Sequence, residues 1–87
     1  MQLDPNEMGD VVNRLKRAHG QLAGVLRMLE EGRHCEDIVT QLTAVSRALD
    51  KAGFAIIATG MKQCITESNG AGAADLRALE KLFLGLG

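Results

Sequence analysis

The chain has 87 residues, with ten Lys and Arg against eleven Asp and Glu, so its formal net charge is −1. This length allows one small domain over residues 1–87, near the size at which a single core is marginal and oligomerisation commonly adds stability. The composition is 46% hydrophobic without Trp or Tyr, which favours aliphatic helix packing over a sheet or an aromatic ligand pocket. No apolar run approaches the roughly 20 residues of a membrane span, and the N-terminus lacks the basic start and apolar core of a signal peptide. We therefore expect a cytoplasmic protein that does not engage a membrane.

The first predicted helix covers residues 6–31. It should start at the stretch Asp4-Pro5-Asn6-Glu7, because proline suits a first helical turn and acidic side chains favour the positive end of the helix dipole. Apolar residues then recur every seven positions along two seams, which is typical of helical bundles. The first seam is Met8, Leu15, Leu22 and Leu29, and the second is Val11/Val12, Ala18 and Val25/Leu26. Gly32 is the expected stop.

The second predicted helix covers residues 35–67 and the third covers residues 73–84. Gly53 and Gly60 each weaken the second helix by up to about 1 kcal/mol relative to Ala. They mark either close approach of another element or tolerated positions, and a kink at either is open. The Ser-Asn-Gly-Ala-Gly stretch at residues 68–72 is a clear helix breaker. The apolar faces are Ile38, Leu42, Val45, Leu49, Ala52, Ile56 and Ile57 on the second helix, and Leu76, Leu79, Leu82 and Phe83 on the third.

Together these elements predict an all-α protomer of three helices. The two long helices, joined by a turn at Gly32-Arg33-His34, form an antiparallel hairpin that alone would leave apolar surface open. Two hairpins would form a dimer with a four-helix bundle, and the third helix would add a further interface.

Basic residues are concentrated on particular helix faces in spite of the balanced total charge. Arg14, Arg17 and Gln21 share one flank of the first helix, and Arg47 and Lys51 lie one turn apart on the second. One interpretation is a solvated helix surface, and the other is a phosphate-binding strip repeated by symmetry in an oligomer. No helix-turn-helix or zinc finger is recognisable, so any DNA contacts would come from the bundle's own surface. Composition alone does not decide between the two.

The two cysteines, Cys35 and Cys64, lie near opposite ends of the second predicted helix. Their separation of 29 positions turns the helix to within roughly 20° of its starting direction and advances it by roughly 43 Å. The thiols therefore share a face but cannot form a disulfide within one unbroken helix. Two antiparallel copies would set Cys35 of one chain against Cys64 of the other. In the cytoplasm such a pair more often indicates metal or redox chemistry than a structural disulfide, the alternative being two small hydrophobic core residues.

Other donors near the cysteines are weaker candidates. His34 is adjacent to Cys35, but neighbouring residues on a helix point in different directions. Met61, three residues before Cys64, could supply a soft thioether, although a core methionine is the commoner outcome. His19 is expected to be a packed or capped histidine of the first helix.

Three stretches closely resemble the CsoR/RcnR family of bacterial repressors. They are Arg-Leu-Lys-Arg-Ala-His-Gly-Gln-Leu-Ala-Gly at 14–24, Met-Leu-Glu-Glu-Gly-Arg-His-Cys at 28–35 and Asp-Ile-Val-Thr-Gln-Leu-Thr-Ala at 37–44, within a similarity over about residues 10–66. The resemblance implies dimers of antiparallel hairpins that assemble into flat, disc-shaped tetramers and bind double-stranded operator DNA. It also implies that an inducer at an intersubunit site releases the DNA. Arg14 and Lys51 match basic positions that the family uses for DNA, Arg17 and Arg47 lie on the same surfaces, and Gln21 resembles a position that couples the inducer site to DNA.

The family's branches differ in their sensing residues. Copper sensors pair a cysteine at the position of Cys35 with a second cysteine, here Cys64, and with a histidine four residues before it, which is Gly60 in this chain. Nickel/cobalt and formaldehyde sensors also use that histidine. Retention of both cysteines without the imidazole resembles the CstR-type persulfide-sensing branch. There an inducing reactive sulfur species links the cysteines of neighbouring subunits through a disulfide or a short polysulfide.

The resemblance therefore favours a cytoplasmic, non-enzymatic, homotetrameric repressor without a cofactor, which reactive sulfur releases from DNA through Cys35 and Cys64. The alternative is a Cu(I)-responsive repressor that binds the metal through both thiolates and Met61. A thiol enzyme such as a sulfur carrier is disfavoured because no general base or substrate pocket is recognisable. A helical assembly module remains the simplest alternative to a regulator.

Overall fold

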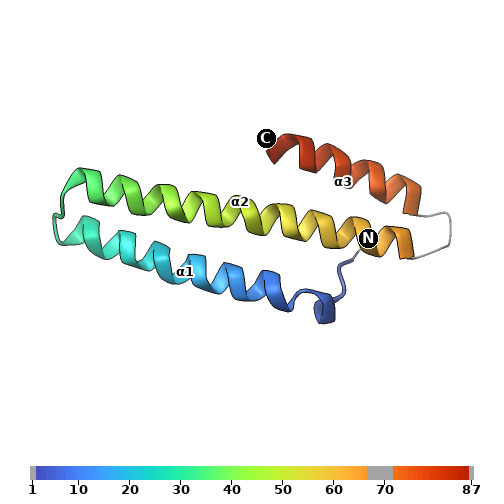
Figure 1. The fold of residues 1–87 in the computed structure, drawn as a ribbon, viewed down its shortest axis with the longest axis horizontal. Helices are drawn as coiled ribbons and strands as arrows, with labels where there is room; N and C mark the ends of the chain where they lie inside the picture. The colour runs from blue at the N-terminus through green and yellow to red at the C-terminus, as the bar shows by residue number, and fades with distance from the viewer. Residues whose placement is uncertain (1, 67–71, 87) are drawn as a thin grey trace.

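The computed structural model describes residues 2–66 and 72–86, and these form three α-helices preceded by a single 3₁₀ turn. The 3₁₀ turn η1 is Pro5–Glu7, and the helices are α1 (Gly9–Glu30), α2 (Cys35–Thr66) and α3 (Gly72–Leu86). α1 and α2 run antiparallel as a long hairpin, and α3 folds back along the C-terminal half of α2 (Figure 1). The molecule is elongated and flat, with extents of 55 × 25 × 13 Å. The prediction of an all-α, three-helix protomer with a long hairpin is confirmed.

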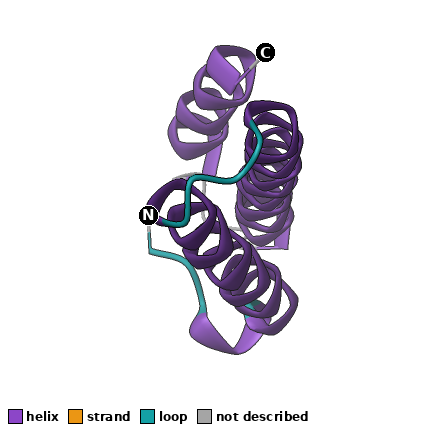
Figure 2. Ribbon diagram, turned by 90° about the vertical axis from the view of Figure 1, so that its left-hand side faces the viewer, coloured by secondary structure: helices purple, strands orange, loops and turns teal. Residues whose placement is uncertain are grey.

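The start of the first helix differs from the expected residue 6. Asp4 accepts a hydrogen bond from the Asn6 backbone N–H at 3.0 Å, and Pro5 opens the 3₁₀ turn. Met8 then departs from helical geometry, and α1 begins only at Gly9. The acidic, proline-containing start signal was therefore assigned to the wrong element, because it caps η1 rather than α1. Figure 2 shows the segment before η1 as a teal loop that leads into this short turn.

The turn between α1 and α2 depends on Gly32. Its φ of 67° lies in the left-handed region, which is open to glycine but strained for other residues. The Gly32 N–H donates to the Leu29 carbonyl and the Arg33 N–H donates to the Met28 carbonyl, the paired bonds of a Schellman motif. The His34 carbonyl then accepts from the backbone N–H groups of Asp37 and Ile38, which starts α2. The predicted stop at Gly32 is confirmed.

The two seams of α1 have different environments. The alternate seam residues Val11, Ala18 and Val25 are buried against α2, whose own buried residues include Val45 and Ala52. The other seam is partly open, since Leu15, Leu22 and Leu29 expose 37%, 39% and 57% of their surface. On α2, Leu42 and Leu49 from the predicted buried face are also exposed. One protomer therefore buries one apolar seam of α1 and leaves the other partly exposed to solvent.

α3 is held on α2 by close approach at the two glycines of α2. A Cβ added at Gly53 would lie 3.3 Å from Leu86 Cδ1, and one added at Gly60 would lie 3.2 Å from Leu79 Cδ1. Phe54 and Phe83 pack edge to face between the same helices, with ring centroids 5.3 Å apart. Both glycines are thus close-approach positions, and α2 is assigned as one helix through both of them.

α2 ends and α3 begins within one residue of the expected bounds, but α3 runs on to Leu86. Most of the predicted breaker at residues 68–72 lies outside the described residues. None of the described helices combines the length and the apolar character that crossing a membrane requires.

Candidate nucleic-acid interface and thiol site

The basic residues singled out in the sequence line one groove between α1 and α2. The groove has a volume of about 360 Å³, and each helix contributes residues at positions i, i+3, i+4 and i+7. Its lining is Arg14, Arg17, Ala18 and Gln21 from α1, and Ala44, Arg47, Ala48 and Lys51 from α2. Because the helices are antiparallel, Arg14 lies at the Lys51 end and Gln21 at the Ala44 end. The two basic pairs, remote in sequence, therefore form one surface.

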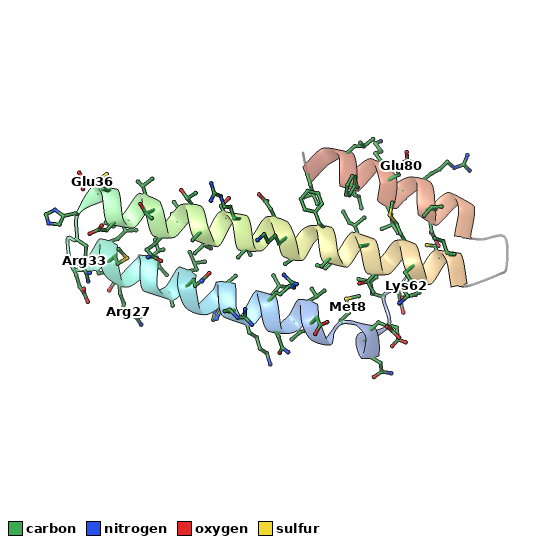
Figure 3. The ribbon with its side chains drawn as sticks, in the orientation of Figure 1. Met8, Arg27, Arg33, Glu36, Lys62 and Glu80 are labelled. Carbon is green, nitrogen blue, oxygen red and sulfur yellow. The ribbon has the colours of Figure 1, made fainter. Side chains whose placement is uncertain are left out.

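The groove carries positive charge that its own lining does not neutralise. Four of its described lining residues are cationic and none is acidic, and all four cations are exposed. The ion pair found among the described residues lies at the turn instead, between Arg33 and Glu31 at 3.5 Å. Unpaired, exposed guanidinium and ammonium groups along a shallow channel suit phosphate oxygens. Figure 3 shows Arg33 and Glu36 at the turn, with Met8 and Lys62 at the opposite end of the hairpin.

Three small residues of the groove were missed in the sequence. Ala18, Ala44 and Ala48 also line it, with short side chains between the longer basic ones. Their spacing could have indicated them, since Ala18 and Ala48 each follow an arginine and Ala44 lies about one helical turn before Arg47. A second cavity of about 360 Å³ continues from Arg14 and Arg17 towards Asp10 and Asn13.

The two cysteines lie at opposite ends of α2 in different environments. Cys35 is the first residue of the helix and is exposed, whereas Cys64 retains only 6% of its surface. Since α2 is assigned as one helix, the roughly 43 Å of axial rise between them applies to the folded protomer. The two thiols of one protomer therefore lie too far apart to act at one site within that protomer.

Three segments of the chain meet at Gly60 and Gln63, close to Cys64 in α2. Gly60, one turn earlier on the same face, is buried beneath Leu79 of α3 and Leu3 of the N-terminal segment. The Leu3 Cδ2 atom would lie 3.4 Å from a Cβ at Gly60. Gln63 binds the same N-terminal segment through its side-chain amide. Two leucine side chains thus form an apolar cap on Gly60.

The remaining soft or imidazole donors are dispersed. His19 is exposed in the protomer, so of the expected packed or capped histidine the packed form is not found there, and His34 is exposed at the turn. Met61 is half-buried near Cys64. Within residues 2–66 and 72–86, no three His, Cys, Asp or Glu side chains are grouped in a way that could hold a metal ion. A site with more than one thiolate therefore needs a second protomer.

Residues 7–84 match the family model described as "Metal-sensitive transcriptional repressor". The copper-sensing transcriptional repressor RicR of Mycobacterium tuberculosis is 36% identical over 55 residues, which cover 63% of this chain and 57% of that protein. The copper-sensing transcriptional repressor CsoR of Bacillus subtilis is 32% identical over 62 residues, covering 71% and 61%. The chain thus spans less than two thirds of the length of either relative.

The fold comparison agrees with these matches. The crystal structure of the copper-sensing repressor CsoR with Cu(I) from Geobacillus thermodenitrificans superposes with a TM-score of 0.76 at 30% identity, covering 98% of this chain and 91% of that one. The family's description is that of a transcriptional regulator and not of an enzyme. The matches over residues 7–84, together with the shared helical hairpin, establish that this chain belongs to the CsoR/RcnR family of metal-sensitive transcriptional repressors.

Proposed function

We propose that this chain is a repressor that binds operator DNA through the groove of Arg14, Arg17, Arg47 and Lys51 and is released by Cu(I). The convergence of these four cations from two helices on one open groove is the observation that carries the DNA-binding part. Phosphate contacts of this kind supply most of the affinity of a protein for DNA, and repetition of the groove in an assembly multiplies them. Gln21, in the same groove, is proposed to couple inducer binding to the DNA surface.

The assembly is proposed to be a dimer of hairpins that pairs into a tetramer in the cytoplasm. The exposed seam Leu15, Leu22 and Leu29 and the exposed leucines of α2 support this, since a second hairpin would bury them in a four-helix bundle. The outward apolar residues of α3, including Leu82 and Leu84, offer a further surface for pairing of dimers.

Cu(I) is the proposed inducer because relatives over the same residues are named copper-sensing and the donors available here are soft. Thiolates suit Cu(I), and Met61 near Cys64 offers a thioether. In an antiparallel dimer Cys35 of one protomer would approach Cys64 of the other, so each site would have two thiolates. The bound metal would supply positive charge and a fixed link between subunits.

Reactive sulfur is the second candidate inducer, and the capped Gly60 favours it, because no imidazole completes a metal site there. One thiolate would attack a polysulfide and become a persulfide as a shorter polysulfide leaves. The partner's thiolate would then displace hydrosulfide from that persulfide and form the intersubunit disulfide. Additional sulfur atoms would relax the geometric demands of this link.

Two parallel treatments of the reduced protein separate the inducers. One sample is titrated with Cu(I) in competition with a chromophoric chelator, and the other receives sodium tetrasulfide before intact mass measurement under denaturing, non-reducing conditions. Each product is then tested by fluorescence anisotropy on a duplex that the wild-type protein selects from a random library. Tight Cu(I) uptake that releases this duplex, and that both Cys35→Ser and Cys64→Ser abolish, supports the copper proposal.

A tetrasulfide-induced covalent dimer, joined by a plain disulfide or heavier by whole sulfur atoms, that loses DNA binding in a protein without tight Cu(I) uptake would identify reactive sulfur, and not copper, as the inducer. Failure of the wild-type protein to select any duplex would overturn the repressor proposal itself.

A further inference from the structure

The first residues of the chain are fastened across the C-terminal end of α2 by one side chain. The Gln63 Nε2 donates to the Gln2 carbonyl at 2.8 Å, and the Asp4 backbone N–H donates to Gln63 Oε1 at 3.1 Å. The side-chain amide thus pairs with an extended backbone on both sides of Leu3, as a neighbouring strand would. We call residues 2–4 the N-terminal strap; Figure 1 shows the chain start lying over this end of α2.

The side chain of Leu3 is directed at α2 by these two bonds. It meets Gly60 from one side while Leu79 of α3 meets it from another, at 3.4 and 3.2 Å from the position of a Cβ. Both leucines are half-buried, so the contact is a genuine packing site. Because glycine leaves no side chain at residue 60, the strap and α3 can both close on this face of the helix.

Cys64 lies next to this closure. It follows Gln63 directly, and it sits one helical turn beyond Gly60, so its sulfur shares the face on which both leucines pack. Cys64 is buried whereas Cys35 is exposed. The difference in accessibility between the two thiols coincides with the presence of the strap and α3 at one end of α2 and their absence at the other.

We propose that the N-terminal strap, with Leu79, is a cover that shields Cys64 and sets its rate of reaction, so that an inducer gains access when the strap lifts. This inference deepens and rests on the proposed function, in which Cys64 is one half of the inducer site. Because residue 60 is glycine and both leucines pack on it, residue 60 offers no ligand of its own beside Cys64.

The strap is built to open easily. Gln2 and Asp4 are exposed, and both hydrogen bonds to Gln63 lie at the surface, where water competes for the same groups. Segments with few buried contacts and solvent-exposed hydrogen bonds are the first to open in native proteins. Lifting of the strap would expose Cys64 without disturbing the hairpin or the basic groove.

The test is thiol labelling of the reduced full-length protein with iodoacetamide in the absence of any inducer, with each cysteine followed separately by peptide mass. Cys35 serves as the internal reference. In the wild-type protein Cys64 should react more slowly than Cys35. In Gln63→Ala the rate at Cys64 should rise about three- to tenfold, as expected for loss of two surface hydrogen bonds that close the strap, and the rate at Cys35 should not change.

Matched variants isolate the cover. Leu3→Ala and Leu79→Ala should each accelerate Cys64, whereas Gln41→Ala in the exposed N-terminal half of α2 and Leu84→Ala on the exposed side of α3 should not. Leu3→Ala keeps both backbone hydrogen bonds and the whole hairpin, so it reports on the cover even if Gln63→Ala alters the helix. Hydrogen exchange at the Asp4 amide gives a second measurement, because Gln63→Ala should remove its protection.

Unchanged Cys64 rates in both Gln63→Ala and Leu3→Ala would overturn the strap. Acceleration by Leu79→Ala alone would also overturn it and would assign the shielding to α3. Because these rates are measured without copper or sulfur, they are independent of whether the inducer is correctly identified. If the strap variants accelerate labelling of Cys64 but neither Cu(I) nor tetrasulfide changes DNA binding, the cover is supported and the proposed function is rejected.

Discussion

Leu79 of α3 occupies the space beside Gly60, so that a side chain at residue 60 would meet Leu79 Cδ1 at only 3.2 Å from its Cβ. A side chain at residue 60 can therefore be accommodated only if Leu79 shifts. The shift needed for a Cβ alone is a few tenths of an ångström, and a larger side chain requires more.

Replacement of Gly60 by His should therefore destabilise the protein by about 1–3 kcal/mol, the usual range for overpacking a closed contact. In the Leu79→Ala background the same replacement should cost less, by about 1 kcal/mol, since both Leu79 methyl groups are then absent and Leu3 Cδ2 is the remaining close neighbour. Urea unfolding of the four proteins of this double-mutant cycle measures the difference. Gly20→His is the control, because nothing described lies within 4 Å of a Cβ at that position. Equal costs in both backgrounds would show that Leu79 does not restrict residue 60.

The groove predicts a specific loss in DNA binding. Arg14→Ala should weaken binding to the selected duplex by roughly five- to fiftyfold at moderate salt, and should flatten the dependence of log K on log salt by about one unit for each groove that contacts DNA. Lys16→Ala removes a cation from the same helix but outside the groove, so it should have a smaller effect. Anisotropy titrations at several salt concentrations measure both quantities. Identical losses of DNA affinity in the two variants would show that the groove has no specific role and that general surface charge accounts for binding.

The exposed seam of α1 predicts how the oligomer can be broken. Leu22→Glu would place a carboxylate in the centre of the proposed four-helix bundle, where burying an unpaired charge costs several kcal/mol. We expect sedimentation velocity to show dissociation towards smaller species while the far-ultraviolet helical signal of the hairpin persists. Ala23→Glu, one residue away and exposed, should leave the assembly intact. If Leu22→Glu still forms a stable oligomer of wild-type size, the interface does not include Leu22 and lies elsewhere on the protomer.

The left-handed φ of Gly32 predicts opposite effects of one substitution at two glycines. Gly32→Ala should destabilise the protein by about 1 kcal/mol, because a Cβ is strained at positive φ. Gly20→Ala lies inside α1 with open space around it and should stabilise by up to about 1 kcal/mol through helix propensity. Thermal unfolding of the two variants, each compared with wild type, measures the sign. Similar shifts in the same direction would contradict the assignment of the turn.

The helices were predictable because the sequence signals for them are local and recur along the chain. The seven-residue spacing from Val11 to Ala18 and Val25 indicated which side of α1 packs, and Gly32 indicated where it ends. The misplaced start of α1 shows the limit of such signals, since Asp4 and Pro5 cap a 3₁₀ turn instead of the helix they precede. Capping chemistry is the same for both elements.

The groove was only half predictable. The sequence indicated that Arg14 and Arg17 share a face, and that Arg47 and Lys51 share another. Whether the two basic pairs meet in one groove depends on the register of α1 against α2. The length of the turn and the buried contacts between the two helices determine this register together. The strap had no sequence signal at all, because Gln63 binds backbone groups about 60 positions away and backbone groups are identical in every sequence.

The unbroken course of α2 has a genetic consequence for an antiparallel dimer. Each protomer would carry one half of two different sensing centres and could complete neither alone. Homodimers of Cys35→Ser and of Cys64→Ser would thus both fail to respond to the inducer. A mixed dimer of the two would regain one complete centre, formed by Cys64 of the first protomer and Cys35 of the second. Co-expression of two inactive alleles should therefore restore part of the response. A protomer lacking both cysteines would instead silence both centres of every wild-type partner that it joins.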